Sequence, residues 1–267
     1  MLDIMTQAKN AIENYNAALQ INSANIANLS IPGYKKLDVS FQSLFERVIN
    51  QGTAAESFNN LGGTNPRQTG SGMSIANVLV NMSQGSFSQT NLIDCAIDGQ
   101  GFFIYSGDGG SSYLYSRAGQ FMVNGGNLTT TAGLQVYGLN SSGTLVPITG
   151  LSGNSSNYSW NDETGDLYYN GASTGYRIAL TYFPNAGGLT QGPGTTYRQS
   201  IASGEAADPL AAGGIAGKVR GGNVEQSNVN YLTESIKSLE IQRAMSSNLS
   251  VVKMASDIIS SFISKLG

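Results

Sequence analysis

Hydrophobic and polar positions follow helical spacing at both ends of the chain and strand spacing between them. In the N-terminal segment, apolar residues recur at alternating steps of four and three, which is typical of a helix with one apolar seam. This seam comprises Met1, Met5, Ala8, Ile12, Tyr15, Leu19, Asn22, Ile26 and Leu29. Ser30-Ile31-Pro32-Gly33 follows it with the two residue types that stop helices. The sequence therefore predicts a helix from Met1 to about Leu29.

Helical spacing resumes near Asn228 and continues to the last residue. One seam holds Leu249, Val252, Ile259, Ile263 and Leu266, and Leu232, Ile236 and Leu239 continue it upstream after a phase drift near Arg243. Two such seams at opposite ends of one chain most simply pair with each other, in the manner of a coiled coil. Their outer faces then contact other copies or water. We therefore predict a protein that polymerises through paired terminal helices.

Between the helical ends, apolar and polar residues alternate with period two, which is typical of half-buried strands. The expected strands are Ser74–Met82, Gly101–Tyr105, Tyr113–Ser116, Gln120–Val123, Gln135–Tyr137 and Arg177–Phe183. Glycine-rich turns such as Asp108-Gly109-Gly110 separate them at short spacing, which predicts antiparallel hairpins. The expected fold is α+β: a helical domain of residues 1–35 and 223–267, an extended linker of residues 36–72, and an inserted antiparallel all-β domain of residues 73–222.

Composition narrows the classes of function. A length of 267 residues suits about two domains at ~150 residues each. The net charge is -3 with 12% charged residues, and the basic residues are scattered singly, so nucleic acid is not an expected partner. The lone cysteine, Cys95, alternates with Ile93 and Ile97 and is expected to be a small buried apolar residue.

Candidate chemistry is sparse. The chain contains no histidine, which removes Cys-His and Ser-His-Asp catalysis and the commonest metal ligand. No catalytic, cofactor or metal site is expected, and neither is enzymatic activity. The 17 acidic residues still allow a secreted β-rich hydrolase with paired carboxylates as a remote alternative, although no carboxylate spacing stands out and the helical ends would be unexplained.

The N-terminal segment does not have the pattern of a cleaved export signal. Asp3 stands where a basic segment is expected, and Lys9 and Glu13 interrupt the apolar run. No apolar run approaches the ~20 residues of a membrane-spanning helix. If the protein works outside the cytoplasm, we expect it to leave unprocessed through a dedicated export apparatus.

Several stretches resemble signatures of the bacterial flagellar rod and hook proteins, and they occur in the order of that family. The N-terminal one ends in Pro32-Gly33-Tyr34-Lys35 after an Asn-x-x-Asn helix end. The others are Gln84–Thr90, Ile93–Phe103, Tyr115–Phe121, Asn127–Thr129, Ser227–Asn230 and Gln242–Ala244, with Gly221–Glu225 as a looser match.

The resemblance implies an axial structural component of the flagellum, exported by the flagellar type III route, which contacts copies of itself and neighbouring rod and hook proteins. In such tubes the terminal helices form the inner layer and the β domain the outer layer. The chain length favours the distal rod. The stretch Gly62–Gly72 also resembles short hook proteins, so a hook protein stays the alternative.

The candidate assembly interface follows from the two seams and the resemblance together. It consists of Ile12, Tyr15, Leu19, Asn22, Asn25, Ile26, Leu29, Leu239, Arg243, Leu249, Val252, Ile259 and Phe262. Asn22 and Asn25 either fix the helix register, as a buried polar residue does in coiled coils, or belong to local turn chemistry. Arg243 either extends over the surface or pairs with a carboxylate such as Glu240 of a neighbouring copy.

Overall fold

The computed structural model describes residues 2–44, 46–50, 52, 63–70, 72–212 and 216–266, with the side chains of residues 2, 46–50, 67–69 and 266 left out. Met1, the Leu266 side chain and the middle of the expected linker, residues 53–62, therefore lie outside the described part. The chain forms two compact units. The helical unit comprises Met1–Ile26, Asp38–Val78 and Tyr231–Gly267, and the β unit comprises Ala27–Leu37 and Leu79–Asn230.

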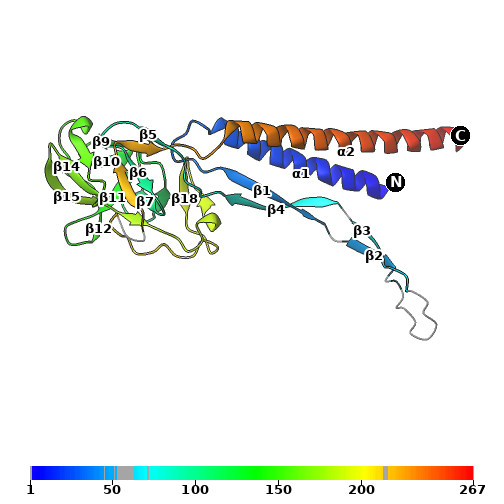
Figure 1. Cartoon of the computed structure of the whole chain (residues 1–267), viewed down its shortest axis with the longest axis horizontal. Coiled ribbons are helices and arrows are strands. Elements are labelled where there is room, and N and C mark those ends of the chain that lie inside the picture. Colours follow the sequence, from blue (N-terminus) through cyan, green and yellow to red (C-terminus); the bar gives the residue numbers. More distant parts are fainter. Residues whose placement is uncertain are drawn as a thin grey trace. The chain divides into compact units, whose positions relative to one another are not determined.

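The helical unit contains two long helices, α1 (Leu2–Ala27) and α2 (Tyr231–Leu266). They lie side by side, and the first residues of α1 and the last residues of α2 lie toward the same end of the unit (Figure 1). The charges at the ends of α2 suit its dipole, with Glu234 in the first turn and Lys265 in the last. Both helices form where the spacing of apolar residues predicted them.

Four strands belong to the same part of the chain. β1 (Leu37–Ser43) forms a two-stranded sheet with β4 (Met73–Val80). β2 (Glu46–Asn50) and β3 (Arg67–Gly70) pair as an antiparallel hairpin, in which Glu46 lies opposite Gly70. In the described part of the chain, β1 and β4 thus accompany the helices as a two-stranded ribbon.

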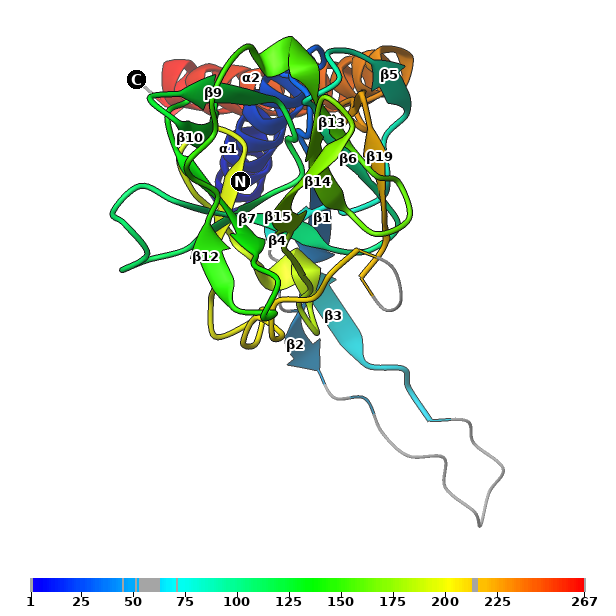
Figure 2. The same cartoon turned by 90° about the vertical axis from the view of Figure 1, so that its left-hand side faces the viewer.

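The β unit is built around a twelve-stranded sheet whose main path is β13-β14-β15-β11-β7-β8-β18-β17. These strands are β7 (Phe102–Ser106), β8 (Leu114–Ser116), β11 (Gln135–Leu139), β13 (Tyr158–Trp160), β14 (Asp166–Tyr169), β15 (Ala172–Ile178), β17 (Thr190–Gln191) and β18 (Thr196–Arg198). The branches are β9 (Phe121–Asn124), β10 (Asn127–Thr130), β12 (Leu145–Pro147) and β16 (Leu180–Thr181). Figure 2 looks onto these strands.

Two further strand pairs bring distant segments of the chain together. β6 (Cys95–Asp98) pairs antiparallel with β19 (Lys218–Gly221), and β5 (Phe87–Gln89) pairs antiparallel with β20 (Asn223–Glu225). The segment before α2, which contains β19 and β20, therefore pairs with strands from the first third of the β unit. The remaining short elements are the 3-10 turns η1 (Ser155–Asn157) and η2 (Ala186–Gly188).

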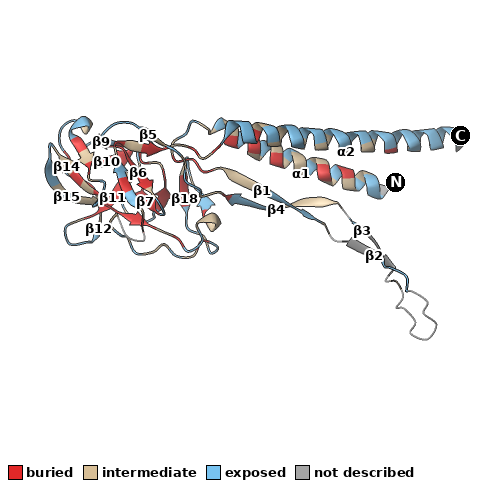
Figure 3. Cartoon of the chain, viewed as in Figure 1, coloured by how far each residue is buried: buried red, intermediate tan, exposed pale blue. Residues whose placement is uncertain are grey.

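Strand β7 explains how the core is divided. Its side chains alternate, so Phe103 and Tyr105 enter one apolar cluster while Phe102 and Ile104 enter a second. All five residues of β7 are buried, as expected for a central strand covered on both faces. Buried residues concentrate in the strands of the β unit, whereas α2 is largely exposed (Figure 3). The α+β class, with two terminal helices and an antiparallel β domain between them, is confirmed.

Candidate assembly interface

Small and polar residues form the buried face of α1. Ala8, Ala11, Ala18, Asn22 and Asn25 are buried at spacings of three and four, and the half-buried Tyr15 completes the row. Short side chains let other elements approach the helix axis closely. The larger residues Ile12, Leu19 and Ile26 flank this row and are half-buried.

An asparagine fixes α1 to the two-stranded ribbon. The Asn14 side chain donates from Nδ2 to the carbonyl oxygen of Met73 (3.1 Å) and accepts at Oδ1 from the backbone N–H of Ile75 (3.1 Å). It thereby takes the place of a neighbouring strand at the edge of β4. At the next residue of α1, the Tyr15 ring packs edge-on against Phe41 of β1, with centroids 5.8 Å apart. The sequence gave no reason to single out Asn14.

Polar contacts join the base of α2 to the same unit. The fully buried Asn25 Nδ2 lies 3.5 Å from Oε2 of the buried Glu234 in the first turn of α2. Lys237 lies within ion-pair distance of Asp38 in β1 (3.5 Å) and of Glu234 (3.6 Å). From there the less exposed positions of α2 continue at steps of three and four: Glu234, Ser238, Ile241, Met245, Asn248, Val252, Ala255 and Ile259.

The predicted interface residues fall into three groups in the folded chain. Asn22 and Asn25 are buried, and Ile12, Tyr15, Leu19, Ile26, Val252 and Ile259 are half-buried. Leu239, Arg243, Leu249 and Phe262 are exposed on α2. Leu29 lies in the turn after α1 ends. Figure 3 shows α2 exposed over most of its length. Its exposed residues include large apolar ones such as Leu239, Leu249 and Phe262.

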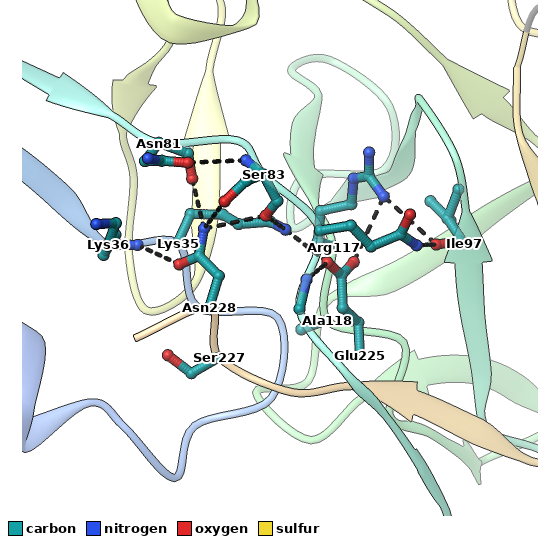
Figure 4. Close-up of polar contacts among 12 residues, drawn as sticks. Lys35, Lys36, Asn81, Ser83, Ile97, Arg117, Ala118, Glu225, Ser227 and Asn228 are labelled. Carbon is teal, nitrogen blue, oxygen red and sulfur yellow. Dashed lines mark hydrogen bonds and ion pairs between the residues drawn. The ribbon is translucent and has the colours of Figure 1, made fainter. Parts of the chain in front are cut away.

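A second candidate functional site lies inside the β unit, where a carboxylate is buried between two cations (Figure 4). Glu225 at the end of β20 is fully buried; its Oε1 accepts from Lys35 Nζ (2.5 Å) and its Oε2 lies 3.4 Å from Arg117 Nη1. The backbone N–H of Gly85 also donates to Oε1 (2.8 Å). Two positive charges and one negative charge leave this ion cluster with a formal charge of +1.

Carbonyl oxygens complete the coordination of the two cations. Lys35 donates to the carbonyl of Ser83 (2.7 Å), and Arg117 donates from Nη2 to that of Gly99 (2.7 Å). The Arg117 guanidinium also stands 5.4 Å from the centre of the Phe102 ring. Burial lowers the pKa of Lys35 and of Arg117 below their ordinary values, and the charge of Glu225 opposes this in both cases.

The backbone around the ion cluster is packed without space for side chains. Gly33 has φ +72°, and a Cβ there would clash with the backbone of Ala118. A Cβ on Gly119 would overlap the carbonyl oxygen of Cys95. The Gly33 N–H donates to the Glu225 carbonyl (2.7 Å), so the segment after α1 and the segment before α2 are bonded directly to each other.

Asn228 makes a parallel set of bonds beside the ion cluster. Its Oδ1 accepts from the N–H of Lys36 (2.8 Å), and its Nδ2 donates to the carbonyls of Asn81 (2.8 Å) and Ser83 (3.0 Å). Three segments far apart in sequence meet at one amide (Figure 4). Every stretch that contributes to the ion cluster or to Asn228 is one that carries the family resemblance, or adjoins one.

Sequence reasoning did not predict this ion cluster, although it singled out the motifs that supply it. The available sign was charge: Lys35, Arg117 and Glu225 are charged residues inside glycine-rich, otherwise neutral motifs. Their separations, 190 residues for Lys35 to Glu225 and 108 for Arg117 to Glu225, give no reason to pair them before the strands are known.

Other chemistry is limited in the part of the chain that the structure describes. Cys95 is fully buried, and burial raises the pKa of its thiol well above the ordinary value, which disfavours the reactive thiolate. No three histidine, cysteine, aspartate or glutamate side chains among the described residues are grouped as metal ligands would be. Neither described helix combines the length and apolar character needed to cross a bilayer.

The fold and the exposed face of α2 together define a class of protein, in which a β domain is inserted between two terminal helices. The helices of such a protein expose apolar surface that other molecules can cover. Comparison with known proteins supplies the family. The chain is 30% identical to the flagellar basal-body rod protein FlgG of Bacillus subtilis over 270 residues, which is 98% of each chain. The chain belongs to the flagellar basal-body rod and hook protein family and is a structural component of the flagellum.

Two further relatives show how the similarity is distributed. FlgG of Buchnera aphidicola is 26% identical over 97% of this chain and 98% of its own. The flagellar hook protein FlgE of Helicobacter pylori is 36% identical over 140 residues, which is 52% of this chain but 19% of that protein. No family model matches the chain.

Proposed function

We propose that this chain is a subunit of the distal rod and assembles helically into a tube that transmits torque. The main support is the similarity to a rod protein, which extends over 98% of both chains. The hook protein of Helicobacter pylori, in contrast, matches over only 19% of its own length. A hook protein stays the second candidate, because the local identity to hook proteins is higher over 140 residues.

In this proposal the terminal helices form the inner layer of the tube, pair in the manner of a coiled coil, and provide the contacts between copies. Support comes from the exposed side of α2, where Leu232, Ile236 and Leu239 have exposed fractions of 67%, 48% and 54%. They lie at i, i+4 and i+7 and so share one face. Because each of these side chains is already partly buried, covering it gains roughly 1–2 kcal/mol, so a neighbouring copy that covers the whole row is favoured.

Asn22 supports a role in register. It is 95% buried, and its Nδ2 has no hydrogen-bond partner among the described residues, a condition that costs about 1–3 kcal/mol. A leucine at this position would pack without that cost. We infer that Asn22 is retained because it disfavours alternative pairings of α1, as a single polar seam residue does in coiled coils.

Substitution on α2 tests the proposal. Leu239→Asp should abolish assembly into rods while leaving the melting temperature of the monomer unchanged, because residue 239 is exposed in the monomer and buried in the tube. Ser247 is also exposed but lies about 80° around α2 from Leu239, so Ser247→Asp adds the same charge away from that side chain and is the control. Rods of normal length in the Leu239→Asp strain, seen by electron microscopy, would show that this face is not an interface.

We further propose that the subunit reaches the rod through the flagellar export apparatus and that it has no catalytic role. The support for export is the family, whose rod members assemble beyond the cytoplasmic membrane. Loss of the subunit from basal bodies and medium in a strain lacking the export gate tests this. Continued delivery in that strain would contradict it.

A further inference from the structure

An apolar pocket of about 280 Å³ opens on the β unit. Ile31 and Pro32 form one side, Ala132 and Leu134 a second, and the loop after β17, beginning at Pro193, a third. No charged side chain lines it among the described residues. A cavity of about 150 Å³ holds a benzene-sized group, so this one accommodates a branched aliphatic side chain.

The same unit presents one isoleucine entirely to solvent. Ile201 is 105% exposed relative to a reference residue, the highest value among the exposed large apolar residues of the described chain. A single exposed apolar residue is ordinary on protein surfaces. What distinguishes Ile201 is the rigidity of the turn that carries it.

Side chains of Ser200 and Ser203 lock that turn from both sides. Ser200 Oγ donates to the carbonyl of Gly188 (2.5 Å) and accepts from the N–H of Ala202 (3.1 Å). Ser203 Oγ accepts from the N–H of Ser200 (2.9 Å), and Asn185 donates to the Ala202 carbonyl (2.9 Å). These hydrogen bonds therefore hold an apolar side chain in solvent in one fixed position, where a partner that covers it gains the hydrophobic free energy.

The isoleucine and the pocket stand at opposite ends of one hairpin. β17 and β18 pair antiparallel, and the loop between them, residues 192–195, borders the pocket. The turn with Ile201 follows the other end of β18 and is bonded to Gly188, just before β17. Because the hairpin separates them, Ile201 cannot fill the pocket of its own chain.

We propose that Ile201 of one copy inserts into this pocket of the next copy and sets the register between them. The inference rests on the proposed assembly. A knob and a pocket on different surfaces form a heterologous contact, which repeats without closing and so generates helical polymers. The pocket is uncharged, as is the turn Ser200–Gly204, so a second copy meets no repulsion there.

The small size of the contact also favours a copy within a polymer over a free dimer. One side chain covers far less than the roughly 1,600 Å² of a stable interface. The contact therefore positions copies that the helices hold together.

Cysteine cross-linking tests this contact. Full-length Ile201→Cys/Ala132→Cys protein is assembled and treated with copper phenanthroline; Cys95 is buried and needs no replacement. We expect a ladder of covalent multimers extending beyond the dimer. The two single variants, and Ile201→Cys with Ser142→Cys at an exposed turn, should give no ladder.

The other outcomes overturn the inference in distinguishable ways. If the protein assembles but no disulfide forms between subunits, the contact is refuted while the proposed function stands. The same holds if the Ser142→Cys pair gives as many covalent multimers as the Ala132→Cys pair. Products that stop at the dimer show an isologous contact instead. Failure of unsubstituted protein to assemble refutes both. Independently, Ile201→Asp should raise the critical concentration for assembly about tenfold or more, whereas Ile201→Val should leave it within about twofold.

Discussion

Replacing Glu225 by glutamine is the sharpest perturbation of the β unit. Glutamine keeps the shape of the side chain and an oxygen that accepts from Gly85 and Lys35, but it removes the negative charge. Lys35 and Arg117 then remain buried, with side chains that are 0% and 6% exposed, and no opposite charge lies between them.

The expected loss follows from that burial. Removing one partner of a buried ion pair typically costs about 3–5 kcal/mol, because the remaining charge has been desolvated without compensation. For a unit of this size, each kcal/mol lowers the melting temperature by about 2–4 °C. We therefore expect Glu225→Gln to lower it by roughly 6–20 °C. Lys35→Met in the same chain should recover part of the loss, since one of the two unpaired cations is then gone.

Thermal unfolding of purified monomers, followed by near-ultraviolet circular dichroism, measures both changes in melting temperature. Asp98→Asn is the matched control, because Asp98 pairs with Arg220 at the surface, where the side chains are 38% and 50% exposed. An exposed pair contributes at most about 1 kcal/mol. Equal losses for Glu225→Gln and Asp98→Asn would show that the buried ion cluster contributes no more stability than an exposed ion pair.

Three further outcomes concern the surroundings of the ion cluster and the turns. Gly119→Ala should destabilise the β unit by about 3 kcal/mol or more, because the added methyl clashes with the carbonyl oxygen of Cys95. Gly70→Ala is the control, because no atom lies within 4 Å of its added methyl, and it should leave stability unchanged. The urea midpoints of the two variants test this difference. Cys95→Ser should cost about 1–2 kcal/mol by thermal melting and leave assembly intact; lost assembly at full stability would assign the thiol a role. Hydrogen bonds from Ser112 and Ser106 lower the pKa of Asp108 to about 2, so its stabilising contribution is complete above the ordinary value of 3.8 and is lost as the pH falls through 2. Carboxyl ¹³C NMR titration should show this midpoint, and one near 3.8 would contradict it.

The sequence predicted those elements whose periodicity is local. α1 ends at Ala27, just before the Pro-Gly stop, and β7 occupies the aromatic run that begins at Gly101. The period-two pattern also located β9 and β11. These elements depend on residues within one or two turns of one another, so a single sequence contains the information.

What depends on pairing across the chain could not be predicted in the same way. Near Arg243 the row of apolar residues changes its position around the helix, and the structure shows the reason. Ile236 and Leu239, before Arg243, lie on the exposed side of α2, while Val252 and Ile259, after it, lie on the half-buried side. The ion cluster depends on β20 pairing with β5, across more than 130 residues. The contribution of the predicted interface residues to assembly stays a prediction.

Electron cryo-microscopy of purified hook–basal bodies tests the central claim most directly. A short tag inserted at the exposed turn of residues 141–143 marks the β unit without touching the helices or the ion cluster. We predict added density around the distal rod, on the outer surface of the tube, with helices lining its inner layer. Added density on the hook, or tagged subunits whose β unit lines the channel, would contradict it.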